Sequence, residues 1–411
     1  MTIKTQRLLD RAKKIAKKGD HEEAQKLYET VLEDSPNNQE AKNALLALKQ
    51  GKDQRSLPKA EVQSVFALYS NGQTQEALDA IETLTKDYPN EPLLFNISGA
   101  CYKEIGQLDA AVESFEKAVT LKPDYAEAHY NLGIAFKELG KVDAAIKTYE
   151  NALAIKHAYP NVHNNLGNIL LELGQLKAAA DHFEWAVAYN PEFDTAHNNL
   201  GSTLLALGQV DAAVESYEKA LTVSPDYAQA HCNLGIALHR LGKVDAAVES
   251  YKKALTVNPD YAEAHNNLGS AFKGLGQLDD AVKSYKKALT VNPDYVSAHN
   301  NLGIAFKQLG QLDDAVECYE KALTINPDYT EAHNNLGNAF KELGQLDDAV
   351  KSYEKALDLN PDYTYAHNNL GNVFKELGQV DAAVECYEKA LAINPDFTGA
   401  QKNLSNAKAL K

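Results

Sequence analysis

Residues 126–159 read AEAHYNLGIAFKELGKVDAAIKTYENALAIKHAY, and closely similar versions of this 34-residue stretch follow one another through most of the 411-residue chain. Eight versions carry an Asn-Leu-Gly triplet, whose asparagine recurs at Asn131, Asn165, Asn199, Asn233, Asn267, Asn301, Asn335 and Asn369. A proline recurs at the same interval from Pro191 to Pro395. A fixed period of about 20 to 50 residues is typical of a solenoid or another array of stacked units. We therefore expect one structural unit that is copied many times.

The two halves of residues 126–159 each have the spacing of an amphipathic helix. Apolar residues recur three and four positions apart in the first half, at Ala128, Leu132, Ala135, Phe136 and Leu139, and in the second half, at Val142, Ala145, Ile146, Tyr149, Ala152 and Leu153. Gly140 separates the halves and predicts a tight turn between two antiparallel helices. Gly133 predicts a close approach of the two helices, because a bulkier side chain there would hold them apart.

In several repeats an aspartate precedes the first helix, and a glutamate or glutamine follows it three residues later. The pairs include Asp124 and Glu127, Asp226 and Gln229, Asp260 and Glu263, and Asp328 and Glu331. This spacing predicts a capping box, in which the two side chains accept hydrogen bonds from free backbone N–H groups at the start of the helix.

The unit resembles the tetratricopeptide repeat. The residues on the signature positions of that family are Leu132, Gly133, Phe136, Gly140, Ala145, Tyr149 and Ala152, although His129 stands where the family often has tryptophan. The resemblance implies an all-α fold, a right-handed superhelical solenoid of antiparallel helix pairs. It also implies that the first helices line the concave side of the superhelix.

The repeats divide the chain into four expected segments. Residues 58–397 hold ten repeats in one phase. Residues 1–50 hold an offset repeat and an extra helix over residues 39–50, and residues 51–57 form a polar linker between this segment and the array. Residues 398–411 begin a first helix without a second one, which predicts a capping helix with a polar outer face.

The concave face would display the asparagines of the eight triplets, hereafter the ladder asparagines. It would also display the residue three positions after each of them, and the residue before each, at Asn164, Asn198, Asn266, Asn300, Asn334 and Asn368. A carboxamide donates and accepts hydrogen bonds, so it matches a peptide backbone of any sequence. The ladder is similar to that in the repeat arm of O-linked N-acetylglucosamine transferases, which implies capture of peptides by Asn131 through Asn369. The alternative is uncharged polar filler, copied by duplication.

The charge of the chain narrows the class of partner. Its formal net charge is −16, whereas nucleic-acid binding needs a basic surface that releases counterions. Co-chaperones of the resembled family seize acidic C-terminal tails with a clamp of lysine, asparagine and arginine. Here Asn164 or Asn198 stands where the first lysine belongs, and Glu127 or Glu263 stands where a second would be. We expect a neutral or basic protein or peptide segment as partner, no nucleic acid and no clamp for acidic tails.

Nothing in the chain predicts a membrane or secretory protein. No run of about 18 apolar residues is present, and no apolar core follows the basic N-terminal residues to make a signal peptide. The four cysteines form no close pair, which predicts neither a disulfide framework nor a zinc knuckle. These features predict a cytoplasmic protein without a membrane span.

A histidine also recurs once per repeat, at His129, His163, His197, His231, His265, His299, His333 and His367. Histidines of neighbouring repeats would lie about 9–10 Å apart, too far to share a zinc ion at about 2.1 Å. We interpret them as packing residues. The chain has no phosphate-binding glycine loop, nucleophile elbow or metalloprotease motif. We therefore predict no metal, no cofactor and no enzymatic activity.

The copies disagree most between residues 156 and 240. His157 occupies the place of the expected proline, and Pro160 comes three residues late, which predicts a junction that packs differently. Exposed apolar and aromatic residues are enriched in binding hot spots. We accordingly predict a specificity patch, formed by Leu171, Trp185, Leu205, His239 and Arg240. The alternative is drift in a tolerant scaffold.

These observations favour a non-enzymatic scaffold that binds an extended peptide or protein segment in an asparagine-lined concave groove. One alternative is the substrate-recognition arm of a transferase whose catalytic domain is separate or lost. Another is a structural solenoid that self-associates end to end, against which the polar C-terminal cap argues.

Overall fold

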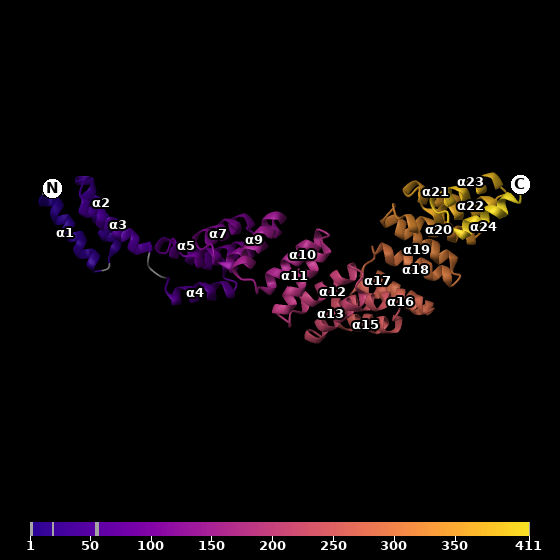
Figure 1. Cartoon of the computed structure of the whole chain (residues 1–411), viewed down its shortest axis with the longest axis horizontal. Helices are drawn as coiled ribbons and strands as arrows, with labels where there is room; N and C mark the ends of the chain where they lie inside the picture. The colour runs from indigo at the N-terminus through magenta and orange to yellow at the C-terminus, as the bar shows by residue number, and fades with distance from the viewer. Residues whose placement is uncertain (1–2, 19, 54–56, 411) are drawn as a thin grey trace. The chain divides into compact units, whose positions relative to one another are not determined.

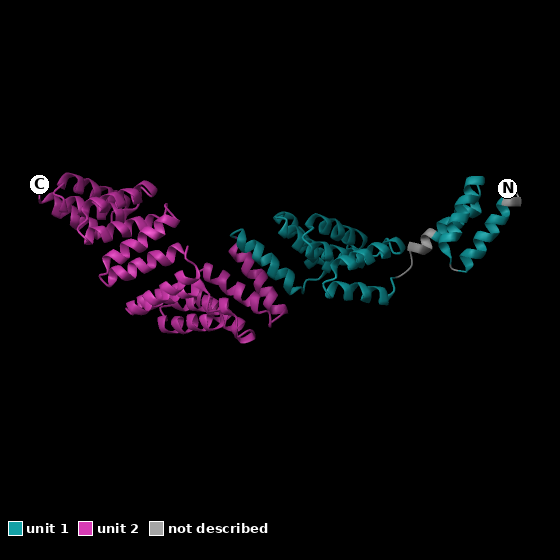
Figure 2. Ribbon diagram, turned by 180° about the vertical axis from the view of Figure 1, so that it is seen from behind, with its two compact units in different colours: residues 1–174 teal, residues 175–411 magenta. Residues whose placement is uncertain are grey.

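The computed structural model describes residues 3–18, 20–53 and 57–410. Within these ranges the chain forms 24 α-helices and no β-strand (Figure 1). The helices group into two compact units, residues 1–174 and residues 175–411 (Figure 2). The all-α fold of consecutive helix pairs that the repeats predict is confirmed.

Three helices come first in the first unit. They are α1 (Ile3–Lys17), α2 (His21–Asp34) and α3 (Gln39–Asp53). The extra helix expected over residues 39–50 is present and ends later, at Asp53. The predicted linker, residues 51–57, is therefore helical at its start, and residues 54–56 lie outside the described part of the chain.

The rest of the first unit is a run of antiparallel helix pairs, followed by one further first helix. Its helices are α4 (Lys59–Ser70), α5 (Thr74–Asp87), α6 (Pro92–Glu104), α7 (Leu108–Leu121), α8 (Ala126–Glu138), α9 (Val142–Ile155) and α10 (Pro160–Glu172). From α4 onward, even-numbered helices are the first helices of their repeats and odd-numbered helices are the second. Within the unit, each first helix from α6 packs on the second helix of the repeat before it.

The second unit continues this pattern. Its helices are α11 (Leu176–Tyr189), α12 (Asp194–Ala206), α13 (Val210–Val223), α14 (Ala228–Arg240), α15 (Val244–Val257), α16 (Ala262–Gly274), α17 (Leu278–Val291), α18 (Val296–Gln308), α19 (Leu312–Ile325), α20 (Thr330–Glu342), α21 (Leu346–Leu359), α22 (Thr364–Glu376), α23 (Val380–Ile393) and α24 (Thr398–Lys408). The helix α24 packs on α22 and α23, where the capping helix is expected.

The turn inside each repeat from α4 onward depends on a glycine with a left-handed backbone. At Gly140 the angle φ is 71°, a conformation that other residues rarely adopt. The N–H of Gly140 donates to the carbonyl of Lys137 at 2.9 Å, and the N–H of Lys141 donates to the carbonyl of Phe136 at 2.8 Å. These bonds close the end of α8. The glycine turn predicted at this position is confirmed.

The glycine of the Asn-Leu-Gly triplet lies against an aromatic ring of the second helix. Tyr285 is fully buried, and a Cβ atom added to Gly269 would lie 2.7 Å from Cε1 of its ring. Favourable contacts between carbon atoms are about 3.5–4.0 Å long. The close approach predicted from this glycine is confirmed, and the tyrosine ring is the group that fills the space of the missing side chain.

The predicted capping boxes are wrong. The N-cap residue of α8 is Tyr125, which makes no side-chain cap bond, so Asp124 lies one residue too early. Tyrosine also occupies the N-cap at Tyr227, Tyr261 and Tyr329. Where an asparagine precedes the proline, it orders the connection, since Oδ1 of Asn258 accepts the N–H of Asp260 at 3.1 Å. A local Asn-Pro-Asp turn thus takes the place of the side-chain cap.

The displaced proline alters the connection between α9 and α10. The N–H of Tyr159 donates to the carbonyl of His157 at 2.8 Å, and α10 begins at Pro160. The helix α10 packs on α9 less closely than the equivalent helices pack elsewhere within the two units. The junction therefore differs from the others, as its sequence predicts.

Two glycines of α16 provide a test with an internal control. The substitution Gly269→Ala should lower the melting temperature, because overpacking against Tyr285 costs about 1–3 kcal/mol. A Cβ atom at Gly274 would have its nearest neighbour 3.9 Å away, so Gly274→Ala should stabilise the fold by about 0.4–1 kcal/mol. Thermal unfolding followed by circular dichroism measures both. Equal effects of the two substitutions would contradict this packing.

Candidate functional site

The ladder asparagines lie on the first helices with part of each side chain exposed. The residue before each of them is more deeply placed, since Asn198 is 2% exposed and Asn300 is 5% exposed. The other buried asparagines of this set are Asn164, Asn266, Asn334 and Asn368. The expectation that these preceding asparagines are displayed for a ligand is therefore wrong.

A hydrogen bond joins most ladder asparagines to the buried asparagine of the preceding repeat. Nδ2 of Asn301 donates to Oδ1 of Asn266 at 3.1 Å, and Nδ2 of Asn335 donates to Oδ1 of Asn300 at 3.0 Å. The same bond joins Asn131 to Asn96, Asn233 to Asn198, Asn369 to Asn334 and Asn403 to Asn368. A buried acceptor left without a donor costs about 1–3 kcal/mol. The ladder thus connects neighbouring repeats at most of its steps, a role that the spacing alone did not reveal.

Two ladder asparagines have weaker partners because another residue occupies the buried position. Cys232 occupies it in α14, and Nδ2 of Asn267 lies 3.8 Å from its sulfur, a poor acceptor. Tyr130 occupies it in α8, and Nδ2 of Asn165 donates to Tyr149 Oη at 3.5 Å. Both contacts are longer than the bonds between asparagines. These two ladder side chains are therefore held less firmly.

The residue three positions after the ladder asparagine meets the buried tyrosine of the second helix. Tyr353 Oη donates to Oδ1 of Asn338 at 2.8 Å, and the equivalent contacts join Tyr217 to Ser202, Tyr285 to Ser270 and Tyr387 to Asn372. Where Ile304 stands at this position, Tyr319 Oη is buried without a partner. Where the residue three positions after the ladder asparagine is polar, it therefore gives the buried tyrosine hydroxyl a hydrogen-bond partner.

The recurring histidines tie each first helix to the loop before it. Nε2 of His265 lies 2.9 Å from the carbonyl oxygen of Pro259, and all eight histidines make the equivalent contact. Because a carbonyl only accepts, Nε2 carries the proton. Nδ1 of His265 is buried without a partner. In α24 Gln401 replaces histidine and donates to the Pro395 carbonyl at 2.7 Å.

Lysines near the ends of the first helices pair with glutamates of the next repeat. Nζ of Lys307 lies 3.0 Å from Oε1 of Glu342, and the equivalent pairs are Lys103 with Glu138, Lys137 with Glu172 and Lys341 with Glu376. Lys273 stands at the same position, but Gln308 replaces the glutamate. Burial lowers the pKa of Lys273. The four lysine–glutamate pairs neutralise one another near the ends of the first helices. Among the described residues, no carboxylate pairs with Lys273.

The predicted specificity patch is divided among several helices. Leu205 and Arg240 are brought together, since the Arg240 guanidinium donates to the Leu205 carbonyl at 3.4 Å. His239 lies beside Arg240 at the end of α14. Trp185 lies on a second helix, α11, and is 47% exposed, while Leu171 lies on α10 of the first unit. The binding role of all five residues stays a prediction.

The described residues offer little support for a metal site or a reactive cysteine. Among them, no group of three His, Cys, Asp or Glu residues could hold a metal ion. The four cysteines are free and buried. Burial raises the pKa of the Cys232 thiol to about 12, so this thiol is protonated and unreactive near neutral pH.

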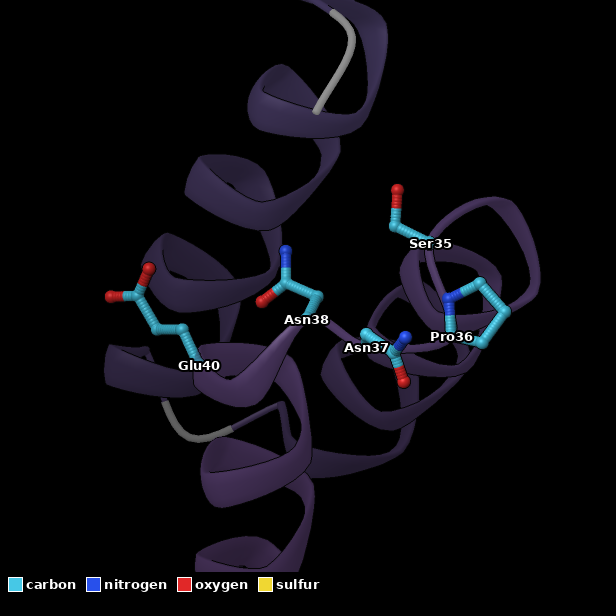
Figure 3. A pocket seen from close by; sticks show the side chains of 5 residues that line it. All are labelled: Ser35, Pro36, Asn37, Asn38 and Glu40. Atoms are coloured by element: carbon cyan, nitrogen blue, oxygen red, sulfur yellow. The ribbon is translucent and has the colours of Figure 1, made fainter.

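A hollow of about 410 Å³ lies where α2 turns into α3 (Figure 3). Its lining residues are Ser35, Pro36, Asn37, Asn38 and Glu40. Oδ1 of Asn38 accepts the N–H of Ala41 at 3.0 Å, which caps the start of α3. Asn38 therefore serves the turn, and Glu40 pairs with Lys13 of α1.

Three family models match the chain. The model described as "Cilia and flagella-associated protein 70 C-terminal domain" matches residues 95–324, more than half of the chain. The model "TPR repeat" matches residues 305–344 and 337–378, and the model "Tetratricopeptide repeat" matches residues 364–397. The chain belongs to the tetratricopeptide-repeat family. The resemblance seen in the signature positions is confirmed.

Curated relatives match this tetratricopeptide-repeat chain over short segments. The peroxisomal targeting signal receptor of Kluyveromyces lactis is 31% identical over 64 residues, which are 16% of this chain and 11% of that receptor. The receptor of the same name from Candida glabrata is 30% identical over 64 residues. The chain thus matches only about a tenth of the length of these relatives, as those coverages show.

A solved structure with a TM-score above 0.5 shows the same fold. The APC/C hetero-tetramer Cut9-Hcn1 is 15% identical, with a TM-score of 0.51, and the match covers 96% of this chain and 95% of that chain. MamA is 31% identical, with a TM-score of 0.37, over 39% of this chain and 95% of that chain.

The tetratricopeptide repeats include no helix, among the residues described, that is long and apolar enough to span a membrane.

Protonation of the buried His197 should destabilise the fold. Burial lowers the pKa of His197 below its usual value of 6.5. The unfolded chain then binds a proton before the folded chain does, so the stability from the neutral form is present above about pH 6.5 and is lost as the pH falls below it. We expect a lower melting temperature at about pH 5.5 than at about pH 7.5.

The substitution His197→Gln is the matched control for this pH dependence. Gln401 shows that glutamine makes the same contact with a proline carbonyl, and glutamine does not titrate. The melting temperature of the variant should therefore fall less between the two pH values. An identical fall in the variant and the wild-type protein would contradict a contribution from His197.

Substitution along the ladder should cost stability according to the bond that is lost. Asn301→Ala leaves Oδ1 of the buried Asn266 without its donor, and we expect a loss of about 1–3 kcal/mol. Asn267→Ala removes two longer contacts, with the sulfur of Cys232 at 3.8 Å and with Nδ2 of Asn266 at 3.4 Å, and should cost less than Asn301→Ala does. Urea unfolding followed by circular dichroism measures both losses. A larger loss for Asn267→Ala than for Asn301→Ala would contradict the structural role of the ladder.

Proposed function

We propose that the chain is a non-enzymatic scaffold that holds an extended protein segment along the ladder asparagines of its first helices. The tetratricopeptide-repeat family consists typically of non-catalytic scaffolds for protein interaction. The observation that carries the proposal is a row of half-exposed carboxamides at equivalent positions, most of them held by a bond to the preceding repeat.

The bonds between repeats leave specific atoms for a ligand. In Asn301 and Asn335, Nδ2 uses one of its two protons on the preceding repeat, and the remaining proton and Oδ1 match the carbonyl and N–H of a peptide backbone. A side chain that is already held loses less conformational entropy on binding. The ladder asparagines are therefore better suited to capture a backbone than freely rotating asparagines would be.

The spacing of the repeats suits an extended chain. Neighbouring packed helices lie about 9–10 Å apart, which is roughly three residues of extended chain at about 3.3 Å each. One carboxamide would thus meet every third residue of the segment and would read its backbone. Selectivity would come from residues that differ between repeats, and we place it at Leu171, Trp185, Leu205, His239 and Arg240.

The charges of the first helices favour a neutral or basic segment. Lysines of this face are largely neutralised by glutamates, as Lys307 is by Glu342. Exposed carboxylates near the helix starts, at Glu127, Glu263 and Glu331, add negative charge. Lys273 is the position where a single acidic residue of the segment would be accepted.

Variants that remove both members of a ladder bond test the capture of a segment. Removing donor and acceptor together is nearly neutral for stability, so one protein would carry Asn266→Ala with Asn301→Ala and Asn300→Ala with Asn335→Ala. The probes are peptides of about 12 residues, roughly four ladder steps, enriched from a random displayed library on the wild-type chain. Fluorescence anisotropy should show at least about tenfold weaker binding, or 1.4 kcal/mol.

The control carries only Asn266→Ala and Asn300→Ala, which keeps every ladder carboxamide. It should retain most of the affinity, because only the support of the ladder is removed. Circular dichroism confirms that both proteins are folded at the temperature of the assay. Unchanged binding by the four-substitution protein would show that the ladder is polar filler and would overturn the proposal.

A further inference from the structure

A hollow of about 870 Å³ lies between the second helices α15 and α17, against the first helix α16. Its apolar lining includes Leu255, Leu268 and Phe272. Four exposed lysines, Lys252, Lys283, Lys286 and Lys287, stand around it and outnumber its two lining carboxylates, Asp260 and Asp280. None of the ladder asparagines lines it. This hollow is therefore a separate site from the row of carboxamides on the first helices.

Smaller versions of the hollow recur at other repeat junctions. One of about 440 Å³ lies between α13 and α15, with Glu218 and Lys253 in its lining. Another of about 400 Å³ lies between α17 and α19, with Asp294 and Lys321 in its lining. The repeat itself thus creates the hollow. What differs at α15 and α17 is its size and the charge around it.

The charge differs because lysine replaces glutamate at two equivalent positions. Glutamate occupies this position of the second helix at Glu116, Glu150, Glu184, Glu218, Glu320, Glu354 and Glu388. Lysine occupies it at Lys252 and Lys286. Each exchange changes the local charge from negative to positive, and both fall on the same hollow. The result is a cationic site in a chain whose net charge is −16.

Part of this positive charge is not neutralised by the protein. Lys252 pairs with Glu249 at 3.0 Å, and Lys283 pairs with Asp280 at 3.2 Å, but both pairs are exposed and contribute little. Lys286 lies over an aromatic ring, and neither it nor Lys287 has a carboxylate partner among the described residues. Burial lowers the pKa of His265 in the lining of the hollow, and the Lys287 charge reaches this ring and lowers its pKa further, while the contact with the Pro259 carbonyl and the Asp260 charge act in the opposite direction.

We propose that this hollow binds an acidic segment of a partner protein, with an aliphatic or aromatic side chain against Leu268 and Phe272 and carboxylates against Lys286 and Lys287. The apolar lining decides between classes of polyanion. A phosphate backbone needs a basic stripe and gains nothing from an apolar lining, whereas a peptide gains from burying an apolar anchor in a pocket. The second-helix site and the ladder would thus prefer segments of opposite charge, which lets one chain join two different partners.

The test uses the full chain and a fluorescein-labelled peptide of about 12 residues in which Asp and Glu alternate with Leu and Phe. Fluorescence anisotropy should show binding that weakens as salt is raised. Salt screens the attraction between the lysines and the peptide carboxylates, and the Debye length falls to about 8 Å at physiological ionic strength. The variant Lys252→Glu with Lys286→Glu should bind at least about tenfold more weakly, or 1.4 kcal/mol. This variant should fold normally, because seven repeats of the same array already carry glutamate there.

Two controls separate the site from total charge. Lys219→Glu with Lys355→Glu makes the same change of charge outside the hollow and should leave the affinity within about twofold, or 0.4 kcal/mol. A peptide in which serine replaces Leu and Phe should bind more weakly than the original. Equal loss of binding in both charge variants, equal binding of the serine peptide, or no binding of the acidic peptide would overturn the proposal.

Two further arms distinguish the occupant and the site. Tighter binding of a single-stranded oligonucleotide than of the acidic peptide would overturn the choice of a protein segment. The protein with four ladder substitutions should bind the acidic peptide as the wild-type chain does. A loss there would overturn the assignment to the second-helix hollow, whereas failure of the ladder test alone would leave this site unaffected.

Discussion

A hydrogen bond from a partly exposed carboxamide of one repeat to a buried carboxamide of the repeat before it recurs at most steps of the ladder. Asn301 and Asn266 form such a pair, 35 residues apart. The buried oxygen of Asn266 needs this donor because an unpaired buried acceptor is costly. An insertion or deletion between the two would separate them. The bond therefore gives a physical reason for a period that runs through the ladder without a slip.

Other buried groups of the repeat impose the same period. The ring of Tyr285 occupies the space over Gly269, and Nε2 of His265 meets the carbonyl of Pro259. Each of these contacts needs a suitable side chain at one particular distance along the chain. The exposed positions of the second helices carry no such requirement. Lys252 and Lys286 lie at exposed positions, so the array can acquire a local cationic site without disturbing its packing.

The sequence predicted the helix pairs, the turn at Gly140 and the close packing at the triplet glycine, because these depend on local spacing. The capping boxes failed because a tyrosine, one residue later than expected, occupies the N-cap. Two adjacent asparagines look alike in the sequence, and only the packing of the preceding repeat shows that Asn300 is buried while Asn301 is half exposed. The bonds between repeats join residues 35 positions apart. The residue pattern within one helix cannot predict such contacts, and only the three-dimensional structure shows them.

A double-mutant cycle on Asn266 and Asn301 tests the central claim most directly. Urea unfolding of the wild-type protein, the two single alanine variants and the double variant yields the coupling free energy of the pair. A net hydrogen bond of about 0.5–1.5 kcal/mol predicts a coupling of that size, whereas the equivalent cycle on Cys232 and Asn267 should give a smaller value. A coupling near zero for Asn266 and Asn301 would show that the ladder does not join the repeats.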